Sequence, residues 1–220
     1  MSGGGLQLLV LAGIALFLIL KLRSVLGTRD GYEPTQNAQA QQAARKAVSG
    51  FEVIDGGVDR DILDNIDGNP KAVEALTEMK KVEPNFSVTE FLGGARGAYE
   101  MILMSFERGD IKEIEPFLSE DVADSFTEVI AAREDQGLTI EAEFVGVREL
   151  ALVDAEFDTT TKQAEMKIKF VGELTSVVKD KDGKIIEGDA QTVKRQKDVW
   201  TFAREMGAND PNWQLVQTGE

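Results

Sequence analysis

The sequence predicts an α+β fold, in which helices pack on one face of an antiparallel sheet, behind an N-terminal transmembrane helix and a flexible tether. Two observations support this prediction. Apolar residues recur at helical spacing as far as Gly137 and alternate with polar residues from Leu138 onward. In addition, an N-terminal apolar run carries no charge. The chain therefore divides into an anchor at 1–26, a polar and acidic linker at 27–68, an amphipathic helix with its lead-in at 69–85, and a folded domain at 86–220.

Composition excludes several classes of protein. The chain has 39 acidic and 24 basic residues and a net charge of −15, whereas a nucleic-acid-binding protein needs a basic face. It has no cysteine and no histidine. Disulfides, thiolate zinc sites, iron–sulfur clusters and histidine-dependent catalytic triads are therefore impossible. We expect no nucleic-acid partner, no metal site, no cofactor and no catalytic site.

The run LQLLVLAGIALFLIL, from Leu6 to Leu20, predicts a membrane anchor. With its apolar neighbours it reaches about 20 residues, the length of helix that crosses a hydrocarbon core of roughly 30 Å. A cleaved signal peptide and a buried core helix are alternatives, but the start MSGGG has no basic residue and no small-residue cleavage site follows. Lys21, Arg23 and Arg29 come after the run, so the positive-inside rule places the N-terminus outside and the body in the cytoplasm.

The linker is predicted to be flexible over 27–46, because Gln, Ala and Gly predominate and little apolar surface can offset the entropy of ordering. The acidic segment 51–67 has no register that satisfies an EF-hand calcium loop, so we interpret it as a solvated segment. Asn69 and Pro70 then begin a short amphipathic helix. Its apolar side suits packing on the body, contact with a partner, or binding to lipid.

Cap residues mark the ends of two longer helices. Ser87 and Glu90 form a capping box that predicts the start of the first helix, and Gly109 predicts its end. Ser119 is expected to cap the second helix, which Gly137 ends.

Seven segments of alternating hydrophobicity follow and predict an antiparallel sheet with one covered face. They span residues 138–144, 150–157, 164–170, 172–179, 185–193, 198–203 and 212–217. Helices followed by such strands give helices on one face of the sheet, and the segment from residue 86 is long enough to form one core.

The stretch from residue 86 to residue 137 resembles the start of the Tim44-like domain. The matching pieces are Phe91-Leu92-x-Gly94-Ala95, Ala98-Tyr99, Phe106-x-x-Gly109-Asp110 with Ile111, Phe117-Leu118-Ser119, Phe126 and Arg133-x-x-x-Gly137. In this family the domain is the C-terminal part of a mitochondrial import-motor subunit, and bacterial members carry it behind one N-terminal membrane span.

The resemblance implies a fold like those of nuclear transport factor two and cystatin, with a long helix on a curved antiparallel sheet around a large apolar cavity. It also implies the roles known in the family, which are tethering, chaperone recruitment and contact with anionic lipid. None of these roles is catalytic. The mitochondrial member's long motor-binding segment has no counterpart in the linker.

Three glycines lie inside the helix that follows Ser87. Gly93, Gly94 and Gly97 cost roughly 1 kcal/mol each relative to alanine, so a compensating gain is expected. Small residues four positions apart let another backbone approach a helix closely. We therefore predict that these glycines allow close packing against the sheet or another helix. The alternative is that they leave room for a ligand or a partner.

Large apolar residues predict a groove between this helix and the sheet. A curved sheet under a helix thinned by glycines can leave an opening the size of an ordinary ligand site. The alternative is that the same side chains fill a core of normal density. The residues expected to face one another are Phe91, Ala95, Tyr99 and Phe106 on the helix and Phe144, Met166, Phe170, Trp200 and Trp213 on the sheet.

Three functions of different classes fit these features. The first is a membrane-anchored, non-catalytic adaptor at the cytoplasmic face of the bacterial inner membrane, which tethers a chaperone or client protein in protein transport or quality control. The alternative is a module that binds lipid or a small apolar ligand in the cavity. The third is an enzyme that uses Asp110, Asp154, Asp158 or Tyr99, but no partner base or oxyanion group is visible. We favour the adaptor, a role that comes from the resemblance.

Overall fold

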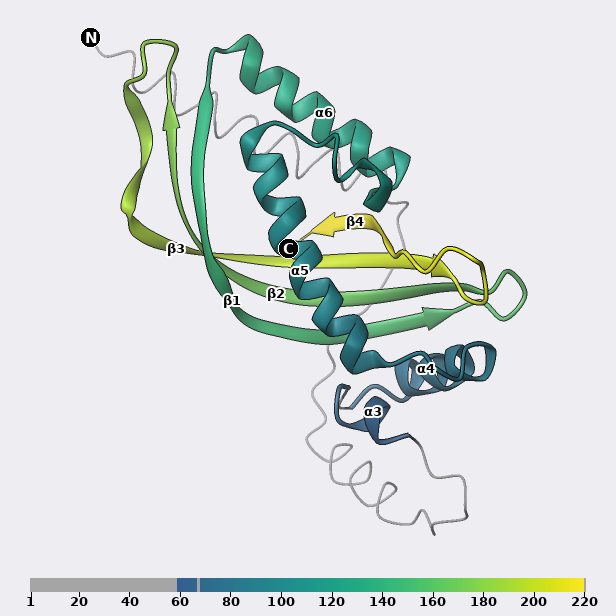
Figure 1. Ribbon diagram of the computed structural model, residues 1–220. Helices are drawn as coiled ribbons and strands as arrows, with labels where there is room; N and C mark the ends of the chain where they lie inside the picture. The colour runs from purple at the N-terminus through teal and green to yellow at the C-terminus, as the bar shows by residue number, and fades with distance from the viewer. Residues whose placement is uncertain (1–58, 67, 220) are drawn as a thin grey trace, which may run out of the picture. The chain divides into compact units, whose positions relative to one another are not determined.

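A computed structural model describes residues 59–66 and 68–219 (Figure 1). In this part of the chain, helices pack against a four-stranded antiparallel sheet, so the predicted α+β class is confirmed. No helix within the described ranges is both long and apolar enough to cross a membrane. The apolar run 6–20 and the linker up to residue 58 lie outside the described residues.

The helices begin and end where the cap residues predict. They are α3 (Arg60–Leu63), α4 (Pro70–Val82), α5 (Val88–Arg108), the 3₁₀ helix η1 (Glu115–Phe117) and α6 (Glu120–Asp135). The Asn69 side chain accepts a hydrogen bond from the amide of Ala72 at the start of α4. Ser87 does the same for Glu90 in α5, and Gly109 ends α5 with φ of 77°, a left-handed conformation that favours glycine.

The strands are fewer and longer than the sequence predicts. They are β1 (Thr139–Phe157), β2 (Gln163–Lys179), β3 (Ile185–Glu205) and β4 (Gln214–Gly219), and each pairs with the next. The first six expected segments were wrong as separate strands and merge in pairs into β1, β2 and β3, whereas the seventh, 212–217, is confirmed as β4. The merging occurs because β-bulges in β1 near Val147 and Asp154, and in β2–β3 opposite Ser176, interrupt the alternation without ending the pairing. Bulges also bend strands, and β1, β2 and β3 curve strongly (Figure 1).

The core lies between α5 and the sheet, with α4 beside it on β1. Every second residue of β2 from Ala164 to Phe170 is fully buried under the helices. The apolar side of α4, formed by Ala72, Leu76 and Met79, is also fully buried. Of the three roles open to this helix, the structure therefore supports packing on the body.

The end of the expected linker is folded, which corrects the boundary at residue 68. Ile62 and Ile66 are 1% and 6% exposed and belong to the core cluster. The sequence suggested a solvated segment because its aspartates dominate the pattern. Instead, Asp61 reaches the start of α5 and Asp59 pairs with Lys80, so these charges dock the segment on the domain.

Candidate interaction site

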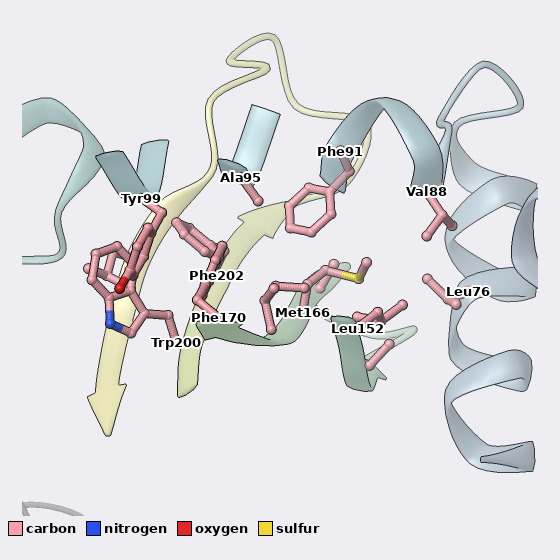
Figure 2. Close-up of a cluster of buried hydrophobic side chains, with 14 of the residues drawn as sticks. Leu76, Val88, Phe91, Ala95, Tyr99, Leu152, Met166, Phe170, Trp200 and Phe202 are labelled. Carbon is pink, nitrogen blue, oxygen red and sulfur yellow. The ribbon is translucent and has the colours of Figure 1, made fainter. Parts of the chain in front are cut away.

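Tyr99 lies at the centre of the predicted groove and is fully buried. Its ring stacks on Phe170 at 4.4 Å between centroids and 8° between planes, and it lies 4.8 Å from the Trp200 ring (Figure 2). Its hydroxyl donates a hydrogen bond of 2.6 Å to the Asp198 carboxylate. Burial, reinforced by this hydrogen bond, raises the pKa of Tyr99 far above its ordinary value. The hydroxyl is thus held as a donor and is not a base at neutral pH.

A glycine in the sheet makes room for this tyrosine. Gly172 of β2 lies opposite Gln196 of β3 and opposite Val147 of β1, in a short stretch of β1 with a register shift just before Gly146 and another just after Val147. A Cβ at position 172 would lie 2.7 Å from the Tyr99 hydroxyl oxygen and 2.9 Å from its Cε1. Gly172 was not among the residues predicted from the sequence, although a glycine inside a strand often marks a close approach of this kind.

The groove residues form a packed core, so the predicted open groove is wrong for most of them. Side chains of α5 point at the sheet and meet its aromatic residues directly (Figure 2). The alternative of a filled core applies, because a curved sheet still closes when large rings stack across it. Six of the nine residues are at most 9% exposed, and they are Phe91, Ala95, Tyr99, Met166, Phe170 and Trp200. Phe144 packs at the edge of this core.

The prediction of close packing at the helix glycines is also wrong. Among the described residues, a Cβ added at Gly93, Gly94 or Gly97 would meet no atom within 4 Å. All three glycines are exposed, while Ala95 and Tyr99 turn toward the sheet. The periodicity placed the apolar stripe correctly, but the glycines lie on the opposite side of the helix. The second reading, room for a partner, stays a prediction.

Phe106 does not face the sheet residues expected for it. Its ring lies 4.5 Å from that of Phe126 on α6, and the Arg133 guanidinium sits 4.3 Å above it. Arg133 also donates to the Phe106 carbonyl at 3.2 Å. Through these contacts Phe106 joins α5 to α6.

The charged neighbours of Phe106 also affect each other. Burial raises the pKa of Glu107 and lowers that of Arg133, while the attraction between the two charges opposes both shifts.

Trp213 belongs to a second aromatic group beside the core. Its ring lies 4.7 Å from Phe91 and 6.0 Å from Phe86. The Arg204 guanidinium lies 5.2 Å from the same ring and pairs with Glu83, whose other oxygen accepts from the Gly207 amide at 2.6 Å. This ion pair ties the end of α4 to the end of β3, and nothing in the sequence pattern marks it.

The acidic residues considered for catalysis do not converge. Asp110 and Asp158 accept hydrogen bonds from backbone amides in their own turns. Asp154 accepts from the Asn69 side chain at 2.9 Å. Each of these carboxylates has a structural role, and Tyr99 is bound to Asp198.

The architecture is the first indication of the class of protein. A long helix lies on a curved antiparallel sheet, the interior is filled with aromatic side chains, and the polar groups named above serve capping and pairing. Residues 72–220 match the family described as the Tim44-like domain, and the chain belongs to this family.

Two similar proteins illustrate the relationship. A protein of Caenorhabditis elegans named "Probable mitochondrial import inner membrane translocase subunit tin-44" is 25% identical over 165 residues, which cover 73% of this chain and 38% of that protein. The chain thus spans well under half of that relative. The intermembrane space region of the chloroplast protein ARC6 is 10% identical with a TM-score of 0.41, over 58% of this chain and 94% of that one, a likeness too weak to compare functions.

Proposed function

We propose that the protein is a membrane-anchored, non-catalytic adaptor that holds a Tim44-like domain at the cytoplasmic face of the bacterial inner membrane. Membership of the family over residues 72–220 carries this proposal. The relative from Caenorhabditis elegans is named as a subunit of an import translocase, which is a protein-transport role. The filled core adds support, because it favours recognition on the outer surface over binding in the interior.

The anchor is the uncharged run from Leu6 to Leu20, and the tether is the polar segment that follows it. Residues 1–47 carry five basic and two acidic side chains, a net charge of +3, so residues 48–220 carry the remaining −18. A body with this charge is repelled by anionic lipid. The tether therefore keeps the domain near the membrane while its surface stays free for a protein partner.

The topology can be tested because the chain has no cysteine. Single variants Ser2→Cys and Lys184→Cys place one thiol before the anchor and one in the exposed turn between β2 and β3. With a membrane-impermeant maleimide, we expect Ser2→Cys to react in intact cells and Lys184→Cys to react only after permeabilisation. The reverse pattern would show that the domain faces outward.

The partner is proposed to be a chaperone or a client polypeptide. Crosslinking of the full chain in intact membranes, followed by purification and mass spectrometry, should capture a chaperone that ATP releases or an unfolded client. A fragment of residues 1–58, which lacks the domain, is the control and should capture neither. Recovery of lipid without any protein would contradict the adaptor and favour the ligand-binding alternative.

A further inference from the structure

We infer that residues 59–66, here called the strap, are a releasable segment that covers a peptide-binding surface of the Tim44-like domain. The strap comprises α3 and its flanks, and it ends before residue 72, where the match to the family begins. It is therefore an addition to the domain, placed where the linker joins it. The surface beneath it belongs to α4 and α5.

The polar side of the strap is held by one carboxylate. Asp61 accepts hydrogen bonds from the amides of Val88 and Thr89 at 2.7 and 2.9 Å, and from the Thr89 hydroxyl at 2.7 Å. It also pairs with Lys80 of α4 at 2.8 Å, as does Asp59. These contacts satisfy free amides at the start of α5 and neutralise a lysine that is only 14% exposed. We name this group, Asp61 with Lys80, Val88 and Thr89, the latch.

The apolar side of the strap consists of two isoleucines. Ile62 and Ile66 are buried in the cluster that contains Leu76 and Val88, which lie close together where α4 meets α5 (Figure 2). Leu63, between them, is 53% exposed. The strap therefore resembles a docked peptide, with one carboxylate and two aliphatic side chains facing the domain.

The strap has little stability of its own. α3 has four residues, far fewer than an isolated helix needs, so its conformation depends on docking. Two buried isoleucines and the latch oppose the backbone entropy of eight residues, which makes opening accessible while the rest of the core stays folded. Release would add about 26 Å of extended chain to the linker. It would also uncover Lys80, the amides of α5 and the apolar surface beside them.

A partner peptide that carries a carboxylate directly before an isoleucine or a similar aliphatic residue matches the uncovered surface. The strap itself carries this combination, because Asp61 directly precedes Ile62. Binding of such a peptide and docking of the strap exclude each other, so each weakens the other by the same factor. The docking of the strap does not depend on whether the chain is anchored, so this inference goes beyond the proposed function.

Hydrogen exchange of the full, detergent-solubilised chain tests the opening. Asp61→Asn removes the charge of the latch, and Asp64→Asn makes the same change at an exposed position of the strap as the matched control. We expect Asp61→Asn to speed exchange at least tenfold in residues 60–66 and 88–90, with β2 unchanged, and Asp64→Asn to have no such effect. Equal exchange in the two variants, or a uniform increase that includes β2, would overturn the proposal.

Peptide binding tests the surface. A fluorescent peptide of residues 57–66 should bind the Asp61→Asn chain at least tenfold more tightly than the unchanged chain, in which the strap competes. The same peptide with its own Asp61→Asn change should bind at least tenfold more weakly. If both peptides bind equally, or neither binds, no peptide-binding surface lies beneath the strap. This assay needs neither a membrane nor a chaperone, so its outcome is separate from that of the adaptor.

Discussion

Replacing Gly172 by alanine tests whether the Tyr99 ring is held rigidly in the core. The added Cβ would lie 2.7, 2.9 and 3.2 Å from three atoms of Tyr99, and real Cβ contacts are essentially never below 3.0 Å. The ring cannot move away easily, because it stacks on Phe170 and contacts Trp200. Displacement would also break the hydrogen bond to Asp198.

Two costs therefore combine in Gly172→Ala. Overpacking costs about 1–3 kcal/mol, and loss of a buried hydrogen bond costs about 1–3 kcal/mol. Alanine in a strand recovers roughly 0.5–1 kcal/mol of backbone entropy. We expect a net loss of about 1–5 kcal/mol in the free energy of unfolding, which lowers the Tm by about 2–20 °C for a domain of this size.

The matched control is Gly97→Ala, because a Cβ at that position meets no atom of residues 59–66 and 68–219 within 4 Å. There the gain in helix propensity should stabilise the protein by about 1 kcal/mol and raise the Tm by about 2–4 °C. Urea unfolding of the full chain, followed by circular dichroism, measures both variants. Equal stability of Gly172→Ala and the unchanged chain would refute the reasoning that the Tyr99 ring is fixed. A destabilised Gly97→Ala would show that the outer side of α5 is covered.

Three further predictions concern charge and burial. In an absorbance titration of a Tyr32→Phe chain, Tyr99, whose pKa burial raises, should ionise only on unfolding; reversible ionisation near pH 10 in the folded state would contradict its burial. Burial raises the pKa of Asp61, but hydrogen bonds from the latch outweigh it and lower the pKa below the unfolded value of about 3.9. Its stabilisation is thus present at neutral pH and lost as the pH falls below about 4, and urea unfolding against pH should show a smaller decline there for Asp61→Asn. Glu83→Ala should cost about 3–5 kcal/mol because it leaves the Arg204 guanidinium buried and unpaired, and Arg204→Met in the same chain should restore most of the loss in urea unfolding; no recovery would mean that the pair is not the cause.

Local patterns predicted the helices well. The caps at Asn69, Ser87 and Gly109 act within a few residues, so their sequence signals are sufficient. Strand lengths were predicted less well, because a bulge such as that near Val147 changes the alternation while the pairing continues. A prediction based on alternation alone therefore splits each long strand into two short ones.

Contacts between distant residues were not predictable from the sequence. Asp61 looked like part of an acidic linker, and its partners lie 27 and 28 residues away. The helix glycines suggested close packing, but small residues four positions apart show only that a backbone could approach the helix, not that one does. The close approach occurs instead at Gly172, and only the position of Tyr99 in three dimensions reveals its importance.

The hydrogen bond from Tyr99 to Asp198 joins residues 99 positions apart, and the ion pair from Arg204 to Glu83 spans 121. Contacts of such high contact order form late and slow folding. While the chain is being synthesised, α4 and α5 leave the ribosome well before β3, so their apolar sides have no sheet to cover. The nascent protein is consequently open to aggregation and to chaperone binding until nearly all of it has been translated.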